Sequence, residues 1–209
     1  MENVIFMEQI IQLNSQAKLS EHFTLGEFTR SASHPEVYNI PSHEAIANLK
    51  RLCGWLEVLR KRYNELYHST PGPFLRPSGS KRPFGSSASL FEEGSSQPSV
   101  FPSSWEEGIG VEEKALLPII INSGYRSPQL NRKIGGAANS NHLTGCAADI
   151  RVSGMEQALR YAVILMDYAD ESKQEFDELL IEKNRYGAIW LHFAVRPSNN
   201  RRKILFINA

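Results

Sequence analysis

A segment dense in serine, glycine and proline interrupts the chain at residues 67–110 and limits the folds that it can adopt. Such a segment buries too little apolar surface to offset the entropy that is lost on ordering. A structureless loop of this length is unusual inside a compact domain, so we interpret it as a flexible insertion at about residues 67–112. With 209 residues and 41% hydrophobic content, the chain can bury one sizeable core. We therefore expect one domain, residues 19–209, that the insertion interrupts and an extension at residues 1–18 precedes.

An amphipathic helix is predicted before the insertion, at residues 43–64. Its apolar side chains recur at spacings of three and four, which places them on one helical face; they are Ile46, Leu49, Leu52, Cys53, Leu56, Leu59 and Tyr63. Pro41 and Ser42 just upstream are a start signal. Because Cys53 belongs to the apolar face, we expect it to be a small buried side chain.

Strands and a further helix are predicted after the insertion. The apolar runs at residues 117–122 and 147–152 are typical of buried strands. Ser153 and Glu156 form a capping box, which indicates a helix over residues 155–169.

The last predicted element is a β-hairpin, because residues 176–182 and 188–194 flank the glycine-containing loop KNRYG. Helices and strands are mixed without a regular βαβ repeat. This order favours an α+β fold with a mainly antiparallel sheet.

Composition and charge exclude several kinds of partner and compartment. Lys+Arg and Asp+Glu are balanced at 23 each, so no basic surface indicates nucleic-acid binding. The N-terminus, MENVIFMEQIIQLNSQ, lacks the basic region, apolar run and cleavage site of a secretion signal. No stretch approaches the ~20 apolar residues of a membrane span. The two cysteines are too few for a disulfide framework. We expect a soluble chain that is made in the cytoplasm.

A possible metal site begins in SNHLTGCAADI, where His142 and Asp149 are separated by small residues. Gly145 and the alanine pair at 147–148 indicate a turn that runs into a strand. A single acid entering a buried strand needs a partner, and metal ligation is one explanation. In AIWLHFA, alternation places His192 and Trp190 on the face opposite the aliphatic residues. Two histidines and a carboxylate would leave an open position on zinc, although structural roles for these residues are an equal alternative.

Several separated motifs resemble the M15 metallopeptidases, which are zinc D-alanyl-D-alanine carboxypeptidases and related peptidoglycan endopeptidases. SGYRSPQLN precedes SNHLTGCAAD, which matches the family signature S-x-H-x-x-G-x-A-x-D, and FDELLIE and WLH follow. LSEHFTLGEFTRS and NLKRLC are similar to a subgroup found in phages and mobile elements. The likeness covers residues 19–66 and 116–195. It implies a hedgehog- or D-Ala-D-Ala-peptidase-like fold with one Zn²⁺ held by His142, Asp149 and His192.

The resemblance also implies substrate-binding and catalytic roles. Arg126 matches the family arginine that faces the substrate carboxylate or the developing oxyanion, a task that suits a planar guanidinium. Ser140 matches a serine that positions substrate, although capping a turn is an alternative role. Trp190 replaces the first histidine of the H-x-H that many relatives carry, and we expect it to contact substrate.

The general base is expected on the first strand of the hairpin. Some relatives carry an acid three residues before the last histidine, where this chain has Ile189. The pattern F-D-x4-E resembles a hedgehog segment and favours Glu182. If residues 182 and 188 pair, residues 178 and 192 also pair, and Glu178, Glu182 and His192 share one face. Glu178 is therefore the alternative base.

The implied function is hydrolysis of peptidoglycan stem peptides or cross-links by metal-activated water. One alternative is a zinc-containing but inactive binding domain, because the acid at position 189 is missing. Another is a structural α+β protein with incidental histidines. An active enzyme would reach the cell wall by release or through other export factors. The bond that is cut and the oligomeric state are open.

Overall fold

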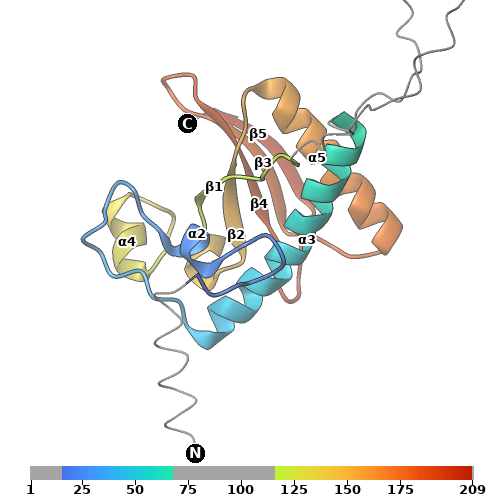
Figure 1. Ribbon diagram of the computed structural model, residues 1–209. Coiled ribbons are helices and arrows are strands. Elements are labelled where there is room, and N and C mark those ends of the chain that lie inside the picture. Colours follow the sequence, from blue (N-terminus) through green and yellow to red (C-terminus); the bar gives the residue numbers. More distant parts are fainter. Residues whose placement is uncertain (1–15, 68–115, 209) are drawn as a thin grey trace, which may run out of the picture. The chain divides into compact units, whose positions relative to one another are not determined.

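The computed structural model describes residues 16–67 and 116–208, which form a helical layer and one sheet (Figure 1). Apart from residue 67, the expected insertion lies outside these residues, as does most of the expected N-terminal extension, and both stay predictions. The helical elements are α2 (Leu25–Thr29), α3 (His43–Tyr67), α4 (Pro128–Lys133), the 3-10 turn η1 (Asn141–Thr144) and α5 (Met155–Ser172). The strands are β1 (Ile121–Ser123), β2 (Ala147–Arg151), β3 (Glu178–Lys183), β4 (Ile189–Ala194) and β5 (Lys203–Asn208).

The five strands lie in the order β1-β2-β4-β3-β5. Neighbouring strands run antiparallel except β3 and β5, which pair in parallel. This arrangement confirms an α+β fold with a mainly antiparallel sheet. No helix in the described part of the chain is long and apolar enough to cross a membrane.

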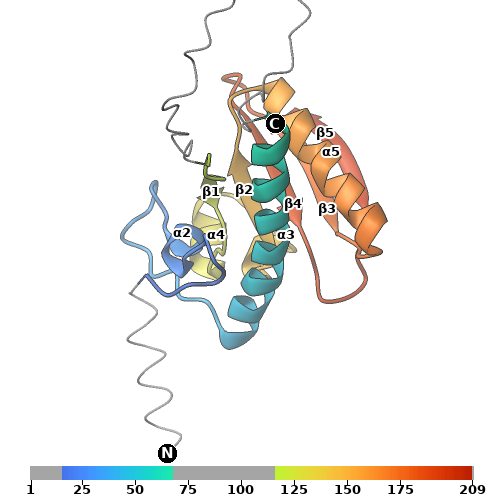
Figure 2. The same cartoon turned by 45° about the vertical axis from the view of Figure 1, so that its right-hand side comes forward.

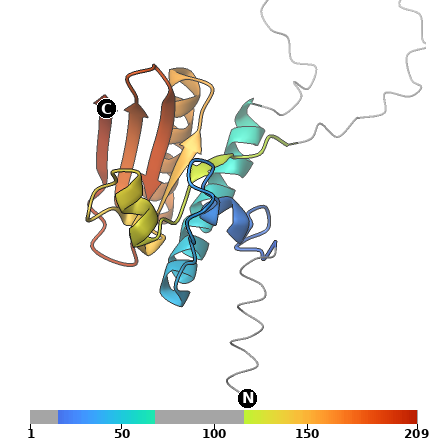
Figure 3. The same ribbon diagram turned by 90° about the vertical axis from the view of Figure 1, so that its left-hand side faces the viewer.

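Helices α3 and α5 lie on one face of the sheet (Figures 2 and 3). Trp55 of α3 anchors this layer: its ring centroid lies 4.8 Å from that of Tyr168 on α5 and 5.5 Å from that of Phe193 on β4. Phe193 and Leu191 are fully buried on this side. Because side chains alternate along a strand, Trp190 and His192 belong to the opposite face. Cys53 is also fully buried, as predicted.

The first predicted strand is shorter than expected, since β1 begins only at Ile121. Its upstream residue Leu117 is fastened to the end of α3, where Asn64 accepts from the Leu117 amide and donates to its carbonyl at 2.7 and 3.0 Å. The pairing of β1 with β2 also shifts register between Ile121 and Ser123. The apolar run 117–122 therefore connects a helix to a short strand.

The predicted capping box at Ser153 and Glu156 is wrong. Gly154 occupies the N-cap position of α5, which starts at Met155. The Ser153 amide instead donates to the side chain of Gln157 at 2.7 Å. The N-cap of α5 is therefore Gly154, one residue later than the pattern predicted.

The hairpin is confirmed, but its predicted register is wrong by two residues. Glu182 pairs with Trp190, Leu180 with His192 and Glu178 with Ala194. The loop lies one residue further along the chain than predicted, because Asn184 bonds to Ala188 through its backbone and side chain, and Gly187 adopts a φ of 87°. A shift by two preserves the side-chain face. Glu178 and Glu182 therefore still share a face with His192.

Strand β5 was not predicted. It follows the basic run at Arg201 and Arg202 and pairs with β3 along the edge of the sheet. Its apolar residues Ile204, Leu205 and Phe206 are about half exposed, so the strand carries no clear alternation between buried and polar positions.

Replacing Trp55 tests the packing of the helical layer on the sheet. We expect Trp55→Ala to lower the free energy of unfolding by about 3–5 kcal/mol, because it leaves a large cavity among buried rings. Tyr38→Ala is the control, since this aromatic side chain is 86% exposed, and should change stability by less than about 0.5 kcal/mol. Denaturant unfolding measures both, and equal effects would contradict the assigned packing.

Candidate metal centre

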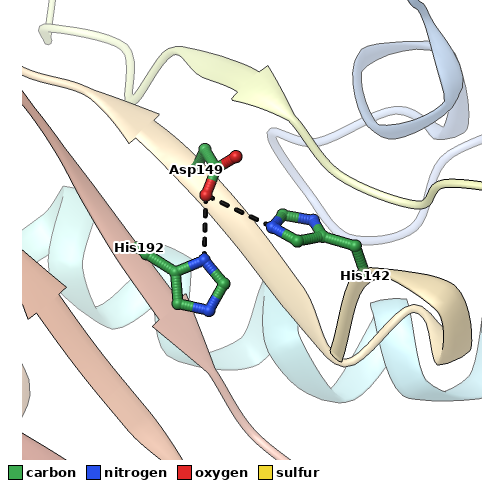
Figure 4. Close-up of side chains that lie close together, drawn as sticks. All are labelled: His142, Asp149 and His192. Atoms are coloured by element: carbon green, nitrogen blue, oxygen red, sulfur yellow. Dashed lines mark hydrogen bonds and ion pairs between the residues drawn. The ribbon is translucent and has the colours of Figure 1, made fainter. Parts of the chain in front are cut away.

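Three side chains from separate elements converge on the face of the sheet opposite α3 and α5. They are His142 of η1, Asp149 of β2 and His192 of β4 (Figure 4). One potential ligand atom from each lies within 4.8 Å of the others, and all three residues are buried. Within residues 16–67 and 116–208, this is the one group of three or more His, Cys, Asp or Glu residues with such spacing.

Strand pairing and a tight turn bring the three side chains together. Asp149 and His192 are direct partners across β2 and β4. His142 lies on η1, which Ser140 caps by accepting from the His142 amide. Gly145 ends η1 with a φ of 71°, and a β-carbon there would lie 2.5 Å from the Ala45 carbonyl oxygen. The turn running into a strand that the sequence predicted is confirmed, and it requires glycine at position 145.

The His142 ring is oriented by a backbone carbonyl. Its Nδ1 lies 2.6 Å from the carbonyl oxygen of Gly124, which can only accept, so Nδ1 carries the proton. Nε2 is left with its lone pair and lies 3.3 Å from Asp149 Oδ1. Burial lowers the pKa of His142, which favours the neutral ring that metal ligation needs.

His192 presents its other nitrogen to the same carboxylate. Nδ1 lies 2.9 Å from Asp149 Oδ1, and Nε2 lies 3.6 Å from Glu178 Oε2. Burial alone would lower the pKa of His192, but the partners Asp149 and Glu178 outweigh it and raise the pKa to about 9. Burial would likewise raise the pKa of Asp149, yet the histidines hold it well below its ordinary value. The raised pKa of His192 therefore follows from its position between the carboxylates of Asp149 and Glu178.

Arg126 lies against the second oxygen of the same carboxylate. Its Nη2 donates to Asp149 Oδ2, and its Nε donates to Ser123 Oγ at 2.8 Å. Ser123 is the register partner of Asp149, so β1 places the arginine beside the cluster. The expected partner of Arg126 was a substrate carboxylate or oxyanion; in the described structure, its guanidinium orients Asp149.

The two candidate bases have different surroundings. Glu178 is paired with four partners: Arg201 Nη2 at 2.8 Å, Asn141 Nδ2 at 2.9 Å, Lys203 Nζ at 3.5 Å and His192 Nε2 at 3.6 Å. The contact with His192, opposed by burial, lowers the pKa of Glu178 to about 2. Burial raises the pKa of Glu182, although the neighbouring His192 opposes this effect.

The other residues singled out in the sequence occupy distinct places. Ser140 caps η1, which is the alternative role considered for it. Trp190 is half-buried on β4, beside Glu182 on one neighbouring strand and Arg151 on the other. Cys146 is buried outside the metal-ligand group, with its Sγ 3.9 Å from the Thr144 carbonyl oxygen.

Sequence reasoning assigned no role to the polar residues behind the cluster. Asn141, Arg196 and Arg201 surround Asp177. Asn141 belongs to η1, the element that carries His142, and Arg196 donates to Asn141. Asp177 belongs to the F-D-x4-E pattern, which was the one signal available. The partners of Asp177 come from distant positions and carry no local pattern.

Comparison with known protein families gives a match over part of the chain. The family model described as peptidase M15 matches residues 94–174. This segment contains Arg126, Ser140, His142 and Asp149, and it ends before β3 and β4. A search of curated proteins gives no match.

Alanine substitution of each cluster residue tests metal binding. We expect His142→Ala, Asp149→Ala and His192→Ala each to abolish retention of one equivalent of metal after reconstitution with Zn²⁺ and desalting. His34→Ala is the control, because His34 pairs with Glu36 on the surface. Elemental analysis provides the measurement, and full metal content in all three cluster variants would contradict the site.

The pH dependence of stability tests the proton on His192. Its folded pKa of about 9 exceeds the ordinary value of 6.5, so its stabilising contribution is complete below pH 6.5 and is lost as pH rises through 9. We expect the Tm of metal-free protein to fall over this window and its apparent metal affinity to rise. The fall in Tm should flatten in His192→Gln, and an unchanged slope would show that another group titrates.

Proposed function

We propose that the chain is a zinc peptidase acting on peptidoglycan stem peptides or cross-links, and the match of residues 94–174 to the peptidase M15 model supports this proposal. The observation that carries the proposal is the buried cluster of His142, Asp149 and His192. Two imidazole nitrogens and one carboxylate oxygen are a ligand set of hydrolytic zinc enzymes, which keep a further position open.

The spacing of the donor atoms fits zinc. Ligand atoms about 2.0–2.1 Å from a tetrahedral ion lie about 3.3 Å from one another. Asp149 Oδ1 lies 3.3 Å from His142 Nε2 and 2.9 Å from His192 Nδ1. The nitrogen of each ring that points away from Asp149 faces an oxygen: His142 Nδ1 faces the Gly124 carbonyl, and His192 Nε2 faces the Glu178 carboxylate. Metal-bound histidines usually have outer partners of this kind. When bound, zinc would lower the pKa of a water molecule and polarise a peptide carbonyl.

Glu182 is the proposed general base. It shares the face of His192, and burial raises its pKa, which is the direction that suits a general base. Glu178 is less suited, because its carboxylate is already paired with Arg201 and Asn141. Glu182 would take a proton from the attacking water and return it to the leaving amine.

Arg126 is proposed to act in two ways. Its contact with Asp149 Oδ2 turns the other carboxylate oxygen towards both histidines. Its positive charge beside the cluster would also stabilise an oxyanion or a substrate carboxylate. Trp190, half-buried on the same face, is proposed to contact the peptide. Ser140 is proposed to help position substrate indirectly, because it caps η1.

Digestion of purified muropeptides, followed by mass analysis, tests the proposed activity. Loss of a single C-terminal amino acid would indicate a carboxypeptidase, and cleavage within cross-links would indicate an endopeptidase. Amidation of the substrate C-terminus should slow a carboxypeptidase and leave an endopeptidase largely unaffected. If zinc-loaded protein cleaves no muropeptide, the proposed hydrolytic activity is wrong, and a zinc-containing binding domain replaces it.

Two isosteric substitutions separate the roles of the glutamates. Glu182→Gln should retain zinc but lower kcat by ~100- to 10,000-fold, because it removes proton transfer. Glu178→Gln should instead weaken zinc binding, because it removes the charged partner of His192. Steady-state kinetics and zinc titration measure both variants. Near wild-type turnover in Glu182→Gln would overturn its assignment as the base.

A further inference from the structure

A fully buried carboxylate, Asp177, lies just before β3 and outside the metal-ligand group. Arg201 binds it in a forked arrangement, with Nε 2.8 Å from Oδ1 and Nη2 2.7 Å from Oδ2. Arg196 Nε lies 2.9 Å from Oδ2. Such pairing is needed because an unpaired buried charge is strongly destabilising.

Asn141 connects this carboxylate to the metal cluster. Its Nδ2 donates to Asp177 Oδ2 at 2.7 Å and to Glu178 Oε2 at 2.9 Å, and its Oδ1 accepts from Arg196 at 2.9 Å. The amide can satisfy two carboxylates and one guanidinium in only one orientation, because nitrogen donates and oxygen accepts. Asn141 is 6% exposed and is therefore held firmly.

Asn141 is connected to both histidines of the cluster. Along the chain, Asn141 directly precedes His142 on η1. Through space, Glu178 accepts from Asn141 and lies 3.6 Å from His192 Nε2. The same amide therefore fixes the turn that carries one ring and the carboxylate that orients the other.

We propose that Asp177 and Asn141 are positioning residues that set the geometry of the two histidines before metal binds. The inference rests on the proposed zinc centre and deepens it. A buried ion pair adds little net stability compared with apolar packing, so stabilisation alone is a weak explanation for this network. Its connection to both rings gives it a specific effect, which is to reduce the rearrangement needed to bind metal.

The first test is Asn141→Ala, which removes the connection but leaves Asp177 paired with Arg201. Zinc affinity, measured by competition with a chromophoric chelator, should fall by about 10- to 100-fold. The visible spectrum of the Co²⁺-loaded protein should change, because it reports the arrangement of ligands around the metal. Asn122→Ala is the matched control: Asn122 also accepts from an arginine, Arg151, but lies outside the network.

Asp177→Asn provides the second test, with Asp170→Asn as its control. Asp170 is also paired with an arginine, but it is exposed and its partner Arg202 is not one of the residues that bind Asp177. Asp177→Asn should weaken zinc binding and alter the Co²⁺ spectrum, whereas Asp170→Asn should match wild type. Circular dichroism of the metal-free proteins shows which variants are folded. If Asp177→Asn does not fold, the zinc affinity and Co²⁺ spectrum of Asn141→Ala alone decide whether the positioning role holds.

The outcomes separate this inference from the proposed function. Wild-type zinc affinity and Co²⁺ spectrum in folded Asn141→Ala would overturn the positioning role while leaving the zinc centre intact. Failure of both variants to fold would also overturn it, because the network would then be structural. Failure of wild type to bind zinc would overturn the zinc centre itself. Weakened zinc binding in the variants, without muropeptide cleavage by wild type, would support positioning and remove only the catalytic proposal.

Discussion

The buried carboxylate of Asp149 needs several partners at once, because an isolated charge in the protein interior is costly. His142 and His192 approach one of its oxygens, and Arg126 binds the other. These partners come from η1, β4 and the loop after β1. The pairing of β2 with its two neighbours and the turn before β2 therefore have to be correct together for this charge to be satisfied.

The two faces of the sheet have different roles. One face packs on α3 and α5 through rings such as Trp55 and Phe193, and the other carries the metal ligands. Alternation along β4 places Phe193 and His192 side by side in sequence but on opposite faces. A ligand on a strand that is packed from behind is held more precisely than one on a loop. Asp177 and Asn141 extend the same support to η1.

Local patterns were sufficient to predict the centre of the fold. Helix α3 was readable from its apolar spacing, and β2 and the hairpin from short apolar runs and turn residues. His142 and Asp149 lie in one motif, strand alternation singled out His192, and the family resemblance implied that the three together bind zinc. Contacts between distant segments could not be read in this way: the hairpin register depended on how Asn184 closes its loop, and β5 lacks alternation. The contact of Arg126 with Asp149 likewise depends on the fold.

A crystal structure of zinc-loaded protein, with diffraction recorded on both sides of the zinc absorption edge, tests the central claim most directly. The account predicts one anomalous peak about 2.0–2.2 Å from His142 Nε2, Asp149 Oδ1 and His192 Nδ1, with a further position open to solvent. A peak held by other residues, or no peak in a crystal soaked with zinc, would contradict it.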